Sequence, residues 1–286
     1  MLNHILQGKV IKGEAVGRTI GFPTANLKLT TVPKVKPGVY AALITLNNQS
    51  FLGLAYYGPR YIFGQKTNTF EVYLFNFNRQ IYGQVLSVKL LKFLRVPQTV
   101  KNINALKKLL ESDLASLNNY VILVDKNDKI IGVETKKTAH LGKAKLHRAI
   151  SVQLFNEKKE LLVQQRSAQK MLFPLYWANT VCTDVRPYET YLQAANRRLQ
   201  EEFSLTAALK PLLKFTYSAQ YGKAGSEKEI DQVFIGFSNV QPKPDPAEIS
   251  AWKYMSLDQI KTFSGQLAPW FKILLKNLSV SDIFKS

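Results

Sequence analysis

Cysteine and histidine are scarce in this sequence, yet most of them are grouped. The 286 residues contain one cysteine, Cys182, and three histidines, of which His140 and His147 lie seven positions apart. Imidazole and thiolate groups are common metal ligands and proton carriers near neutral pH. Because three of these four scarce residues lie in one stretch, we interpret them as parts of a chemical site in the C-terminal half.

A glycine-rich stretch marks a second candidate site near the N-terminus. Gly13, Gly17 and Gly21 recur at four-residue spacing, and the sequence Gly-Phe-Pro-Thr-Ala-Asn occupies positions 21–26. Glycine lets a backbone turn tightly and come close to phosphate oxygens. The spacing alone is equally typical of an ordinary turn between strands, so a phosphate site depends on the residues that follow the glycines.

Length and composition indicate a soluble globular protein with two domains. A chain of 286 residues can form two separate cores, and 46% of its residues are hydrophobic and 21% charged. No stretch approaches about 18 unbroken apolar residues, so we expect no transmembrane helix. The first ten residues lack the apolar run of a secretory signal. One cysteine cannot form an internal disulfide, which favours a cytoplasmic location.

The net charge of +19 would suit a polyanionic partner such as nucleic acid. The lysines, however, are scattered in pairs such as Lys107-Lys108 and Lys158-Lys159, and no arginine-rich arm or zinc-ribbon spacing is present. We therefore favour a solvated basic surface over nucleic-acid binding. A positive field would also attract phosphorylated small substrates.

The N-terminal region has the pattern of β-strands. Segments rich in β-branched and aromatic residues are separated by turn signals such as Asn47-Asn48 and Gly58-Pro59. Closely spaced strands of this kind predict a small antiparallel barrel. A helix over 103–114, with apolar residues at helical spacing from Ile103 onward, should cover the barrel. The predicted strands are 38–46, 51–57, 69–77 and 84–93.

A short polar break at 116–119 precedes a mixed pattern of strands and helices. We place the boundary there, which gives domains at 1–118 and 119–286, the second of them α/β. In one predicted helix the buried stripe would consist of Leu192, Ala195, Leu199 and Phe203. The predicted strands are 120–125, 150–155 and 232–237, and the predicted helices are 188–203, 256–264 and 268–278.

The sequence at 21–26 resembles the motif of riboflavin kinase, in which a glycine loop precedes Pro-Thr-Ala-Asn. The resemblance continues through 38–40, 53–58 and 70–72 to Leu94-Arg95, and covers residues 5–117. It implies a Greek-key β-barrel with a C-terminal helix. It also implies transfer of the γ-phosphate of ATP to the 5′-hydroxyl of riboflavin, which gives FMN.

The resemblance also implies roles for single residues of the first domain. Thr24 would contact Mg²⁺, Asn26 would support the phosphate site, and Glu71 would orient or deprotonate the hydroxyl. Phosphoryl transfer depends mainly on positioning and charge neutralisation, so these roles are chemically sensible. Without the motif, Glu71 would be interpreted as a solvated strand residue. The nucleotide-binding residues implied by the family are Gly13, Gly17, Gly21, Thr24 and Asn26.

Two features of the first domain bear on its substrates. Tyr73 stands where many riboflavin kinases have histidine, which affects the expected contacts with the flavin but not the proposed chemistry. Relatives that also make FAD carry an adenylyltransferase domain before the kinase. Because this sequence begins at the kinase, we expect no FAD synthesis.

The second region resembles type 1 isopentenyl-diphosphate isomerase, a divergent member of the Nudix fold with a mixed sheet. The resemblance covers residues 119–279 and depends on an ordered set rather than on one motif. That set comprises His140, His147, Trp177-Ala-Asn179-Thr-Val-Cys182, Glu202 and Glu227-Lys228-Glu229. Taken singly, each of these residues would be interpreted as an ordinary core or surface residue. Their occurrence together in the family's order favours a site.

The isomerase resemblance implies three groups of site residues. Imidazole and carboxylate ligands together suit Mg²⁺, Mn²⁺ or Zn²⁺, and a carbocation is stabilised by an aromatic face. The implied metal ligands are His140, His147, Asp184, Glu202, Glu227 and Glu229, with Glu202 holding a second Mg²⁺ against the diphosphate. The implied proton carriers are Cys182 and Glu229, assisted by Tyr217. The implied substrate-binding residues are Lys136, Arg166, Lys170 and Trp270.

Two positions depart from common patterns. Asp184 stands where the isomerase family usually has a histidine ligand, so the ligand set is richer in oxygen and should favour Mg²⁺ or Mn²⁺ over Zn²⁺. The substitution could equally mark a lost metal site. Arg198 occupies the position of a glutamate that Nudix hydrolases use, as it does in the isomerase family. This argues against general nucleotide hydrolysis.

The sequence therefore predicts a bifunctional cytoplasmic enzyme. One domain would make FMN from riboflavin and ATP, and the other would interconvert isopentenyl and dimethylallyl diphosphate. These two products are together the substrates of flavin prenylation, so a flavin prenyltransferase is the expected client. Two alternatives stay open for the second domain, namely a Nudix pyrophosphatase and a non-catalytic sensor of isoprenoid diphosphates.

Overall fold

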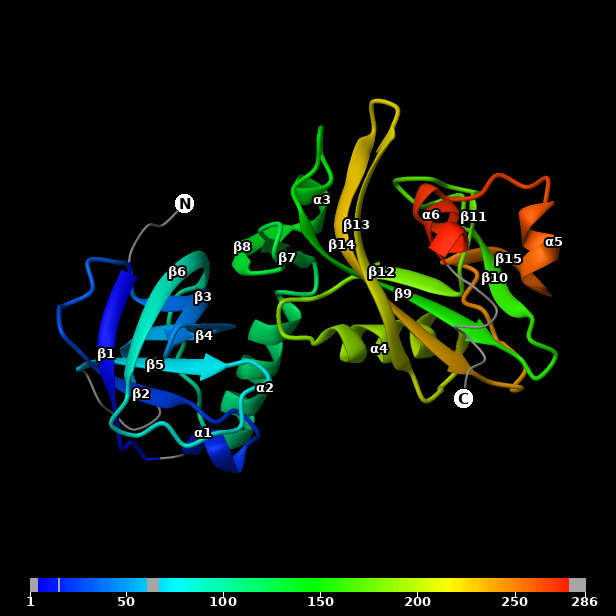
Figure 1. Cartoon of the computed structure of the whole chain (residues 1–286). Coiled ribbons are helices and arrows are strands. Elements are labelled where there is room, and N and C mark those ends of the chain that lie inside the picture. Colours follow the sequence, from blue (N-terminus) through cyan, green and yellow to red (C-terminus); the bar gives the residue numbers. More distant parts are fainter. Residues whose placement is uncertain (1–4, 15, 61–66, 278–286) are drawn as a thin grey trace. The chain divides into compact units, whose positions relative to one another are not determined.

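The protein is described by a computed structural model over residues 5–14, 16–60 and 67–277. Within these residues the chain forms two compact units (Figure 1). The first extends to Ile122 and also includes Lys129–Glu134 and Arg186–Tyr188, and the second comprises the remainder. The boundary after residue 118 stays a prediction, because the chain passes between the two units more than once.

The first unit is a closed antiparallel barrel with the strand order β1-β2-β5-β4-β3-β6, as predicted. Alternation of side chains places Leu86, Val88 and Leu90 of β6 in the core, where none of them is exposed. The sequence pattern did not predict β1 or β2. The strands are β1 Ile5–Ile11, β2 Ala25–Leu29, β3 Gly38–Leu46, β4 Gln49–Pro59, β5 Asn68–Leu74 and β6 Val85–Arg95.

Two helices accompany the barrel, α1 Val16–Thr19 and α2 Ile103–Ala115. Asn102 caps α2, and its side-chain oxygen accepts from the backbone N–H of Ala105 at 2.9 Å. Ile103 is exposed rather than buried as predicted. Instead, the helix is joined to β6 by a buried ion pair between Asp113 and the guanidinium of Arg95, at 2.5 and 2.7 Å. Because this buried helix position carries a charged residue, the hydrophobicity pattern does not predict which face of α2 is buried.

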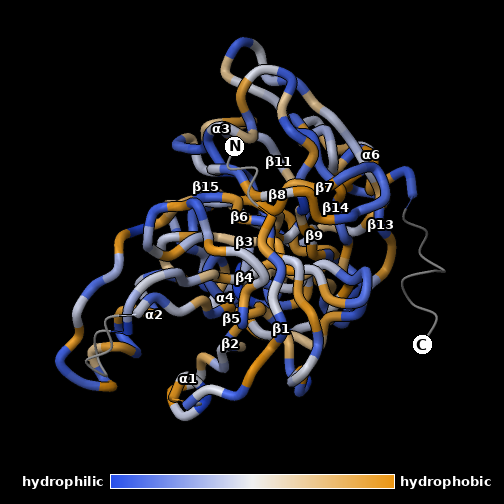
Figure 2. Tube along the Cα trace, turned by 90° about the vertical axis from the view of Figure 1, so that its left-hand side faces the viewer, coloured by the Kyte–Doolittle hydropathy of each residue, from blue (hydrophilic) through white to orange (hydrophobic). Residues whose placement is uncertain are grey.

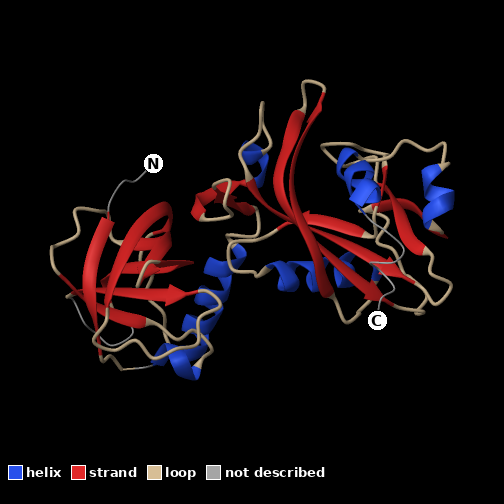
Figure 3. Cartoon of the chain, in the orientation of Figure 1, coloured by secondary structure: helices blue, strands red, loops and turns tan. Residues whose placement is uncertain are grey.

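Most of the second unit is a mixed sheet with the order β11-β10-β9-β14-β13, to which β12 and β15 attach (Figure 3). Strands β7 and β8 belong to the same sheet, but most of their residues are assigned to the first unit. The sheet is mixed because β14 runs parallel to β9, whereas the other pairings are antiparallel. The strands are β7 Tyr120–Val124, β8 Ile130–Thr135, β9 His147–Phe155, β10 Leu161–Arg166, β11 Trp177–Ala178, β12 Val181–Asp184, β13 Lys210–Tyr221, β14 Gly225–Phe237 and β15 Ile249–Met255.

The helices of the second unit are α3 Lys136–Ala139, α4 Tyr191–Phe203, α5 Leu257–Lys261 and α6 Pro269–Asn277. Helix α4 begins after Thr190, which forms a capping box with Gln193, so it starts later than predicted. Leu192 is 42% exposed, and Ala194 takes its place in the buried stripe. The last residue predicted for the final helix, Leu278, lies outside the described residues.

Hydropathy follows this architecture. In Figure 2 the hydrophobic stretches of the trace lie mainly on strands, and the most hydrophilic stretches lie on the outer loops. Across the described part of the chain, none of the helices combines the length and apolar character needed to cross a membrane.

Asp128 joins several elements of the second unit. Its carboxylate accepts hydrogen bonds from Arg148 Nε at 2.7 Å, from the Tyr191 hydroxyl at 3.0 Å and from Lys214 Nζ at 2.7 Å. Burial opposes ionisation of this carboxyl, but the bonds from Lys214 and Arg148 outweigh it and lower its pKa. The carboxylate thus connects the turn after β7 to β9, α4 and β13.

We predict that Asp128→Ala destabilises the second unit by about 2 kcal/mol, because the Arg148 guanidinium and the Tyr191 hydroxyl lose their shared acceptor. Urea unfolding followed by tryptophan fluorescence measures this, since all three tryptophans lie in the second unit. Asp258→Ala is the control, because that side chain is 88% exposed. Equal unfolding midpoints for the two variants would contradict the prediction.

Candidate active sites

The residue register between β9 and its neighbouring strands sets the geometry of the C-terminal site. Antiparallel pairing sets Cys182 of β12 opposite Ser151, and parallel pairing sets Glu229 of β14 opposite His147. Tyr217 of β13 lies opposite Glu229. Paired residues point to the same face of a sheet, and so do residues two apart along a strand. One face of four neighbouring strands therefore carries several of the predicted residues, namely His147, Cys182, Asp184, Tyr217, Glu227 and Glu229.

The tautomers of the two histidines follow from their backbone contacts. Nδ1 of His140 lies 2.7 Å from the carbonyl oxygen of Lys136, and Nδ1 of His147 lies 2.7 Å from that of Lys145. A carbonyl only accepts, so each Nδ1 carries the hydrogen. In the neutral rings, each Nε2 then presents a bare lone pair to the site. Such backbone bonds orient histidines that bind metals.

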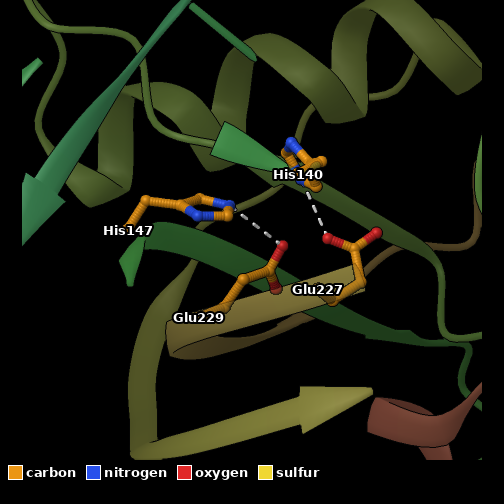
Figure 4. Close-up of side chains that lie close together, drawn as sticks. All are labelled: His140, His147, Glu227 and Glu229. Carbon is orange, nitrogen blue, oxygen red and sulfur yellow. Dashed lines mark ion pairs between the residues drawn. The ribbon is translucent and has the colours of Figure 1, made fainter. Parts of the chain in front are cut away.

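The bare nitrogens face carboxylates (Figure 4). Nε2 of His140 lies 2.9 Å from Glu227 Oε2, and Nε2 of His147 lies 3.5 Å from Glu229 Oε1. All four side chains are buried, and one ligand atom from each lies within 4.8 Å of the others. Buried lone pairs that face one another require a cation between them. The chemistry of this donor set therefore fits a divalent metal ion.

Protonation would be the other way to balance this cluster. Burial alone would lower the pKa of the His147 imidazole, but hydrogen bonds and charge from Asp184 and Glu229 raise it well above its usual value. Burial, with the charge of Glu227, raises the pKa of Glu229 to about 7. These buried groups can therefore lie this close together only if a cation or bound protons supply positive charge.

Asp184 lies beside the cluster and also contacts a lysine. Its Oδ1 is 3.1 Å from His147 Nε2 and 3.7 Å from His140 Nε2, whereas its Oδ2 is 2.7 Å from Lys136 Nζ. One oxygen thus faces the imidazoles and the other is paired with a cation. Asp184 thus places one carboxylate oxygen at this edge of the cluster, and its role as a metal ligand stays a prediction.

Cys182, Tyr217 and Trp270 line one cavity together with Glu229. Burial, reinforced by the nearby carboxylates and opposed by Arg166, raises the pKa of the Cys182 thiol to about 12, so it keeps its proton at neutral pH. The Tyr217 hydroxyl donates to Glu229 Oε2 at 2.6 Å. The Trp270 indole N–H donates to Asn179 Oδ1 at 3.1 Å, which fixes its ring at the cavity wall.

Four cationic side chains line the same cavity. Arg166 is held by the carbonyl oxygens of Leu172 and Phe173, both at 3.0 Å, and lies 3.6 Å from Cys182 Sγ. The sequence predicted three of the cations as substrate ligands but missed the fourth, Arg198, and with it the acidic Glu248. The cations are Lys136, Arg166, Lys170 and Arg198.

Glu202 does not lie in this cavity. It is buried, its Oε1 accepts from Arg198 Nε at 2.9 Å, and its Oε2 accepts from Gln164 Nε2 at 2.8 Å. Both oxygens are therefore engaged by donors. In this arrangement the carboxylate fixes Arg198 and does not present an oxygen to a second Mg²⁺, the role that the resemblance implied for it.

The predicted residues of the N-terminal site also converge. Asn26 of β2 pairs with Glu71 of β5, and the Thr24 hydroxyl donates to Glu71 Oε2 at 3.2 Å. Arg60, which follows β4, binds Glu71 Oε1 through Nε at 2.6 Å and also donates to Asn26 Oδ1. Glu71 is thus not a solvated strand residue. A lone arginine after Gly58-Pro59 has no recognisable sequence signal, so Arg60 was missed.

The three glycines before this site are required by close approach or by backbone conformation. A Cβ at Gly13 would lie 2.0 Å from the Asn26 side chain, and one at Gly17 would lie 2.2 Å from the carbonyl oxygen of Phe22. Gly21 has φ +86°, a conformation that other residues rarely adopt. The glycines therefore let the loop pack closely around the Thr24 and Asn26 side chains.

Thr24 lines two cavities. The first also contains Glu71, Tyr73 and apolar side chains of α2, whereas the second contains Arg18 and Arg79. The described residues around the second cavity include no carboxylate, so this cavity suits an anion. A phosphate donor in the second cavity and a hydroxyl acceptor in the first would meet at Thr24 and Glu71.

Comparison with known proteins agrees with this division. A riboflavin kinase family model matches residues 1–121, and a NUDIX domain model matches residues 145–277. The isopentenyl-diphosphate Delta-isomerase of Pectobacterium atrosepticum is 41% identical over 157 residues, covering 54% of this chain and 87% of that protein. That of Halorhodospira halophila is 38% identical over 169 residues, covering 57% and 97%.

The matched regions contain the Thr24–Glu71 cluster in the first case and His147, Glu227 and Glu229 of the histidine and glutamate cluster in the second, whereas His140 lies just before the NUDIX match. The chain thus combines a riboflavin kinase domain with a NUDIX domain, and through the second it belongs to the isopentenyl-diphosphate Delta-isomerase family.

Proposed function

We propose that this protein is a bifunctional cytoplasmic enzyme. Its barrel phosphorylates riboflavin with ATP to give FMN, and its second domain interconverts isopentenyl and dimethylallyl diphosphate. The observation that carries the second activity is a single cavity that combines a protonated thiol, a buried carboxylate, a tryptophan face and a cationic wall. The first activity is supported by the family match and by the Thr24, Asn26 and Glu71 cluster.

In the kinase reaction, the riboflavin 5′-hydroxyl oxygen attacks the γ-phosphorus of ATP and the bond to the β,γ-bridging oxygen breaks. Glu71 orients the hydroxyl and takes up its proton, and ADP leaves. Thr24 would offer its hydroxyl oxygen, a hard donor, to the Mg²⁺ that arrives with ATP, and Asn26 would support the phosphate site. Arg60, bound to Glu71 and Asn26, adds positive charge where negative charge develops.

In the isomerase reaction, a proton adds to the terminal CH₂ carbon of isopentenyl diphosphate and leaves a tertiary carbocation. Loss of a proton from the neighbouring CH₂ group then forms the new double bond, so the proton count is unchanged. Cys182 and Glu229 are the two proton carriers, and Tyr217 is bonded to Glu229. The Trp270 ring stabilises the cation by its π face.

The four-residue cluster of His140, His147, Glu227 and Glu229 would hold a divalent cation that neutralises the carboxylates and fixes Glu229. With Asp184 beside them, the donors comprise two imidazoles and three carboxylates, which favours Mg²⁺ or Mn²⁺ over Zn²⁺. Lys136, Arg166 and Lys170 supply positive charge for the diphosphate.

The pairing of products suggests a pathway. FMN and dimethylallyl diphosphate are together the substrates of flavin prenylation, so we propose that the fusion supplies both to a flavin prenyltransferase. The motivation is the presence of the two domains in one chain.

For the kinase, Glu71→Gln should lower kcat at least about 100-fold, because the amide cannot accept the hydroxyl proton. Formation of FMN from riboflavin and ATP, followed by chromatography, measures this. The same variant should isomerise isopentenyl diphosphate at the parent rate, since Glu71 belongs to the other domain. A Glu71→Gln enzyme with parent kinase activity would contradict the role.

For the isomerase, incubation with isopentenyl diphosphate and Mg²⁺ in deuterated water should place deuterium in the new methyl group of dimethylallyl diphosphate. Cys182→Ala and Glu229→Gln should each lower this incorporation by about 1000-fold, because each removes one proton carrier. Mass spectrometry of the product reports it. Both variants should keep kinase activity, because Cys182 and Glu229 belong to the other domain. Parent-level deuteration in either variant would exclude that residue as a proton carrier.

For the pathway, cells that contain a flavin prenyltransferase should lose prenylated FMN when the fused gene is deleted, and should make less of it when the two domains are expressed separately. Liquid chromatography of extracted flavins measures the level. Equal levels with the fusion intact, split or deleted would count against the proposed link and would leave both enzyme activities unaffected.

A further inference from the structure

We infer that Glu248 is a positioning residue that fixes Lys170 and Arg198 as a pair of cations for the substrate diphosphate. The inference rests on the proposed isomerase activity. Glu248 lines the cavity together with both cations. Its Oε2 accepts from Arg198 Nη2 at 2.9 Å and is also bound by Lys170 Nζ. One carboxylate oxygen thus holds two positive side chains side by side.

Glu248 is anchored through its own backbone. It immediately precedes β15, its N–H donates to the carbonyl oxygen of Asp245 at 3.0 Å, and its carbonyl oxygen accepts from the N–H of Ser167 at 2.9 Å. Ser167 follows directly after β10, so the anchor joins the ends of two paired strands. The carboxylate is therefore presented to the cavity from a fixed main chain.

The network continues behind the cations. Arg198 Nε donates to Glu202 Oε1 at 2.9 Å, Glu202 Oε2 accepts from Gln164 Nε2 at 2.8 Å, and that amide also donates to the carbonyl oxygen of Thr180 at 2.8 Å. Gln164 and Glu202 are both almost fully buried. Arg198 is thus held from two sides, whereas among the described residues Glu248 is the carboxylate that pairs with Lys170.

The negative charge of Glu248, taken alone, would weaken binding of the diphosphate. A negative charge in the wall of a diphosphate site repels the ligand, so removing it should tighten binding. Positioning has the opposite effect. Two cations that share one oxygen would repel each other if it were removed, and the lysine side chain would regain rotamer freedom. The sign of the effect therefore separates the two roles.

Two substitutions test this in the full-length enzyme. Glu248→Gln keeps the side-chain length and removes the charge, whereas Glu248→Asp keeps the charge and shortens the reach. If Glu248 positions the cations, both should raise the Kd for inorganic pyrophosphate, measured by calorimetry with Mg²⁺, by about tenfold. Both should also raise KM for isopentenyl diphosphate more than they lower kcat.

A matched control is Glu201→Gln, which removes a carboxylate 3.0 Å from Arg198 Nη1 on the exposed side of α4. It should bind pyrophosphate as the parent does. Tighter binding by Glu248→Gln together with parent-like binding by Glu248→Asp would overturn the inference and leave a purely repulsive charge. If Glu248→Gln fails to fold, Glu248→Asp alone tests the inference, because only the positioning role predicts that this variant binds pyrophosphate more weakly.

The two proposals fail separately. A parent enzyme that neither binds pyrophosphate nor forms dimethylallyl diphosphate would refute the proposed isomerase activity itself. A parent enzyme that does both, with Glu248 variants unchanged in Kd and KM, would refute only the positioning role.

Discussion

The C-terminal domain depends on one constraint, the burial of four lone-pair donors that face one another. Backbone carbonyls take the Nδ1 hydrogens of His140 and His147, so both Nε2 atoms are left to face acidic oxygens. Such a cluster is unfavourable without positive charge, because the groups have lost their hydration. The sheet tolerates it because the same strands that bury these groups also set their spacing. A bound divalent cation would balance the charge of these buried groups and so make the cluster a metal site.

Strand β9 is what brings the parts together. It pairs with β12 on one side and with β14 on the other, so the thiol of Cys182 and the carboxylate of Glu229 come from the two strands that flank it. The parallel pairing with β14 matters, because it places Glu229 opposite His147. The cationic wall comes from outside these strands, from α3, β10, the loop that follows β10, and α4. The candidate metal ligands, the proposed proton carriers and the proposed diphosphate ligands therefore come from different elements that meet at one cavity.

The sequence predicted the two folds, and it did so through motif order more than through periodicity; the roles of the predicted site residues stay predictions, although many of those residues lie close together in the structure. The first half of β14 was missed because Glu227, Glu229 and Asp231 are poor strand formers, and their burial in the site overrides that preference. Arg60 and Glu248 were missed because their importance lies in the partners that they contact across the fold. The hydrogen-bond partners of Glu202, Arg198 and Gln164, likewise could not be predicted from sequence spacing, because they meet it only in the folded chain.

Direct measurement of metal binding is the sharpest test of this account. Titration of the full-length protein with Mn²⁺, followed by loss of the free-ion signal in electron paramagnetic resonance, should show one tight site per chain without nucleotide. That site should disappear in His140→Ala and in Glu227→Gln and persist in Thr24→Val. Asp184→His should shift its preference toward Zn²⁺. A parent protein that binds no Mn²⁺, Mg²⁺ or Zn²⁺, or a tight site that survives loss of His140 and Glu227, would contradict the central claim.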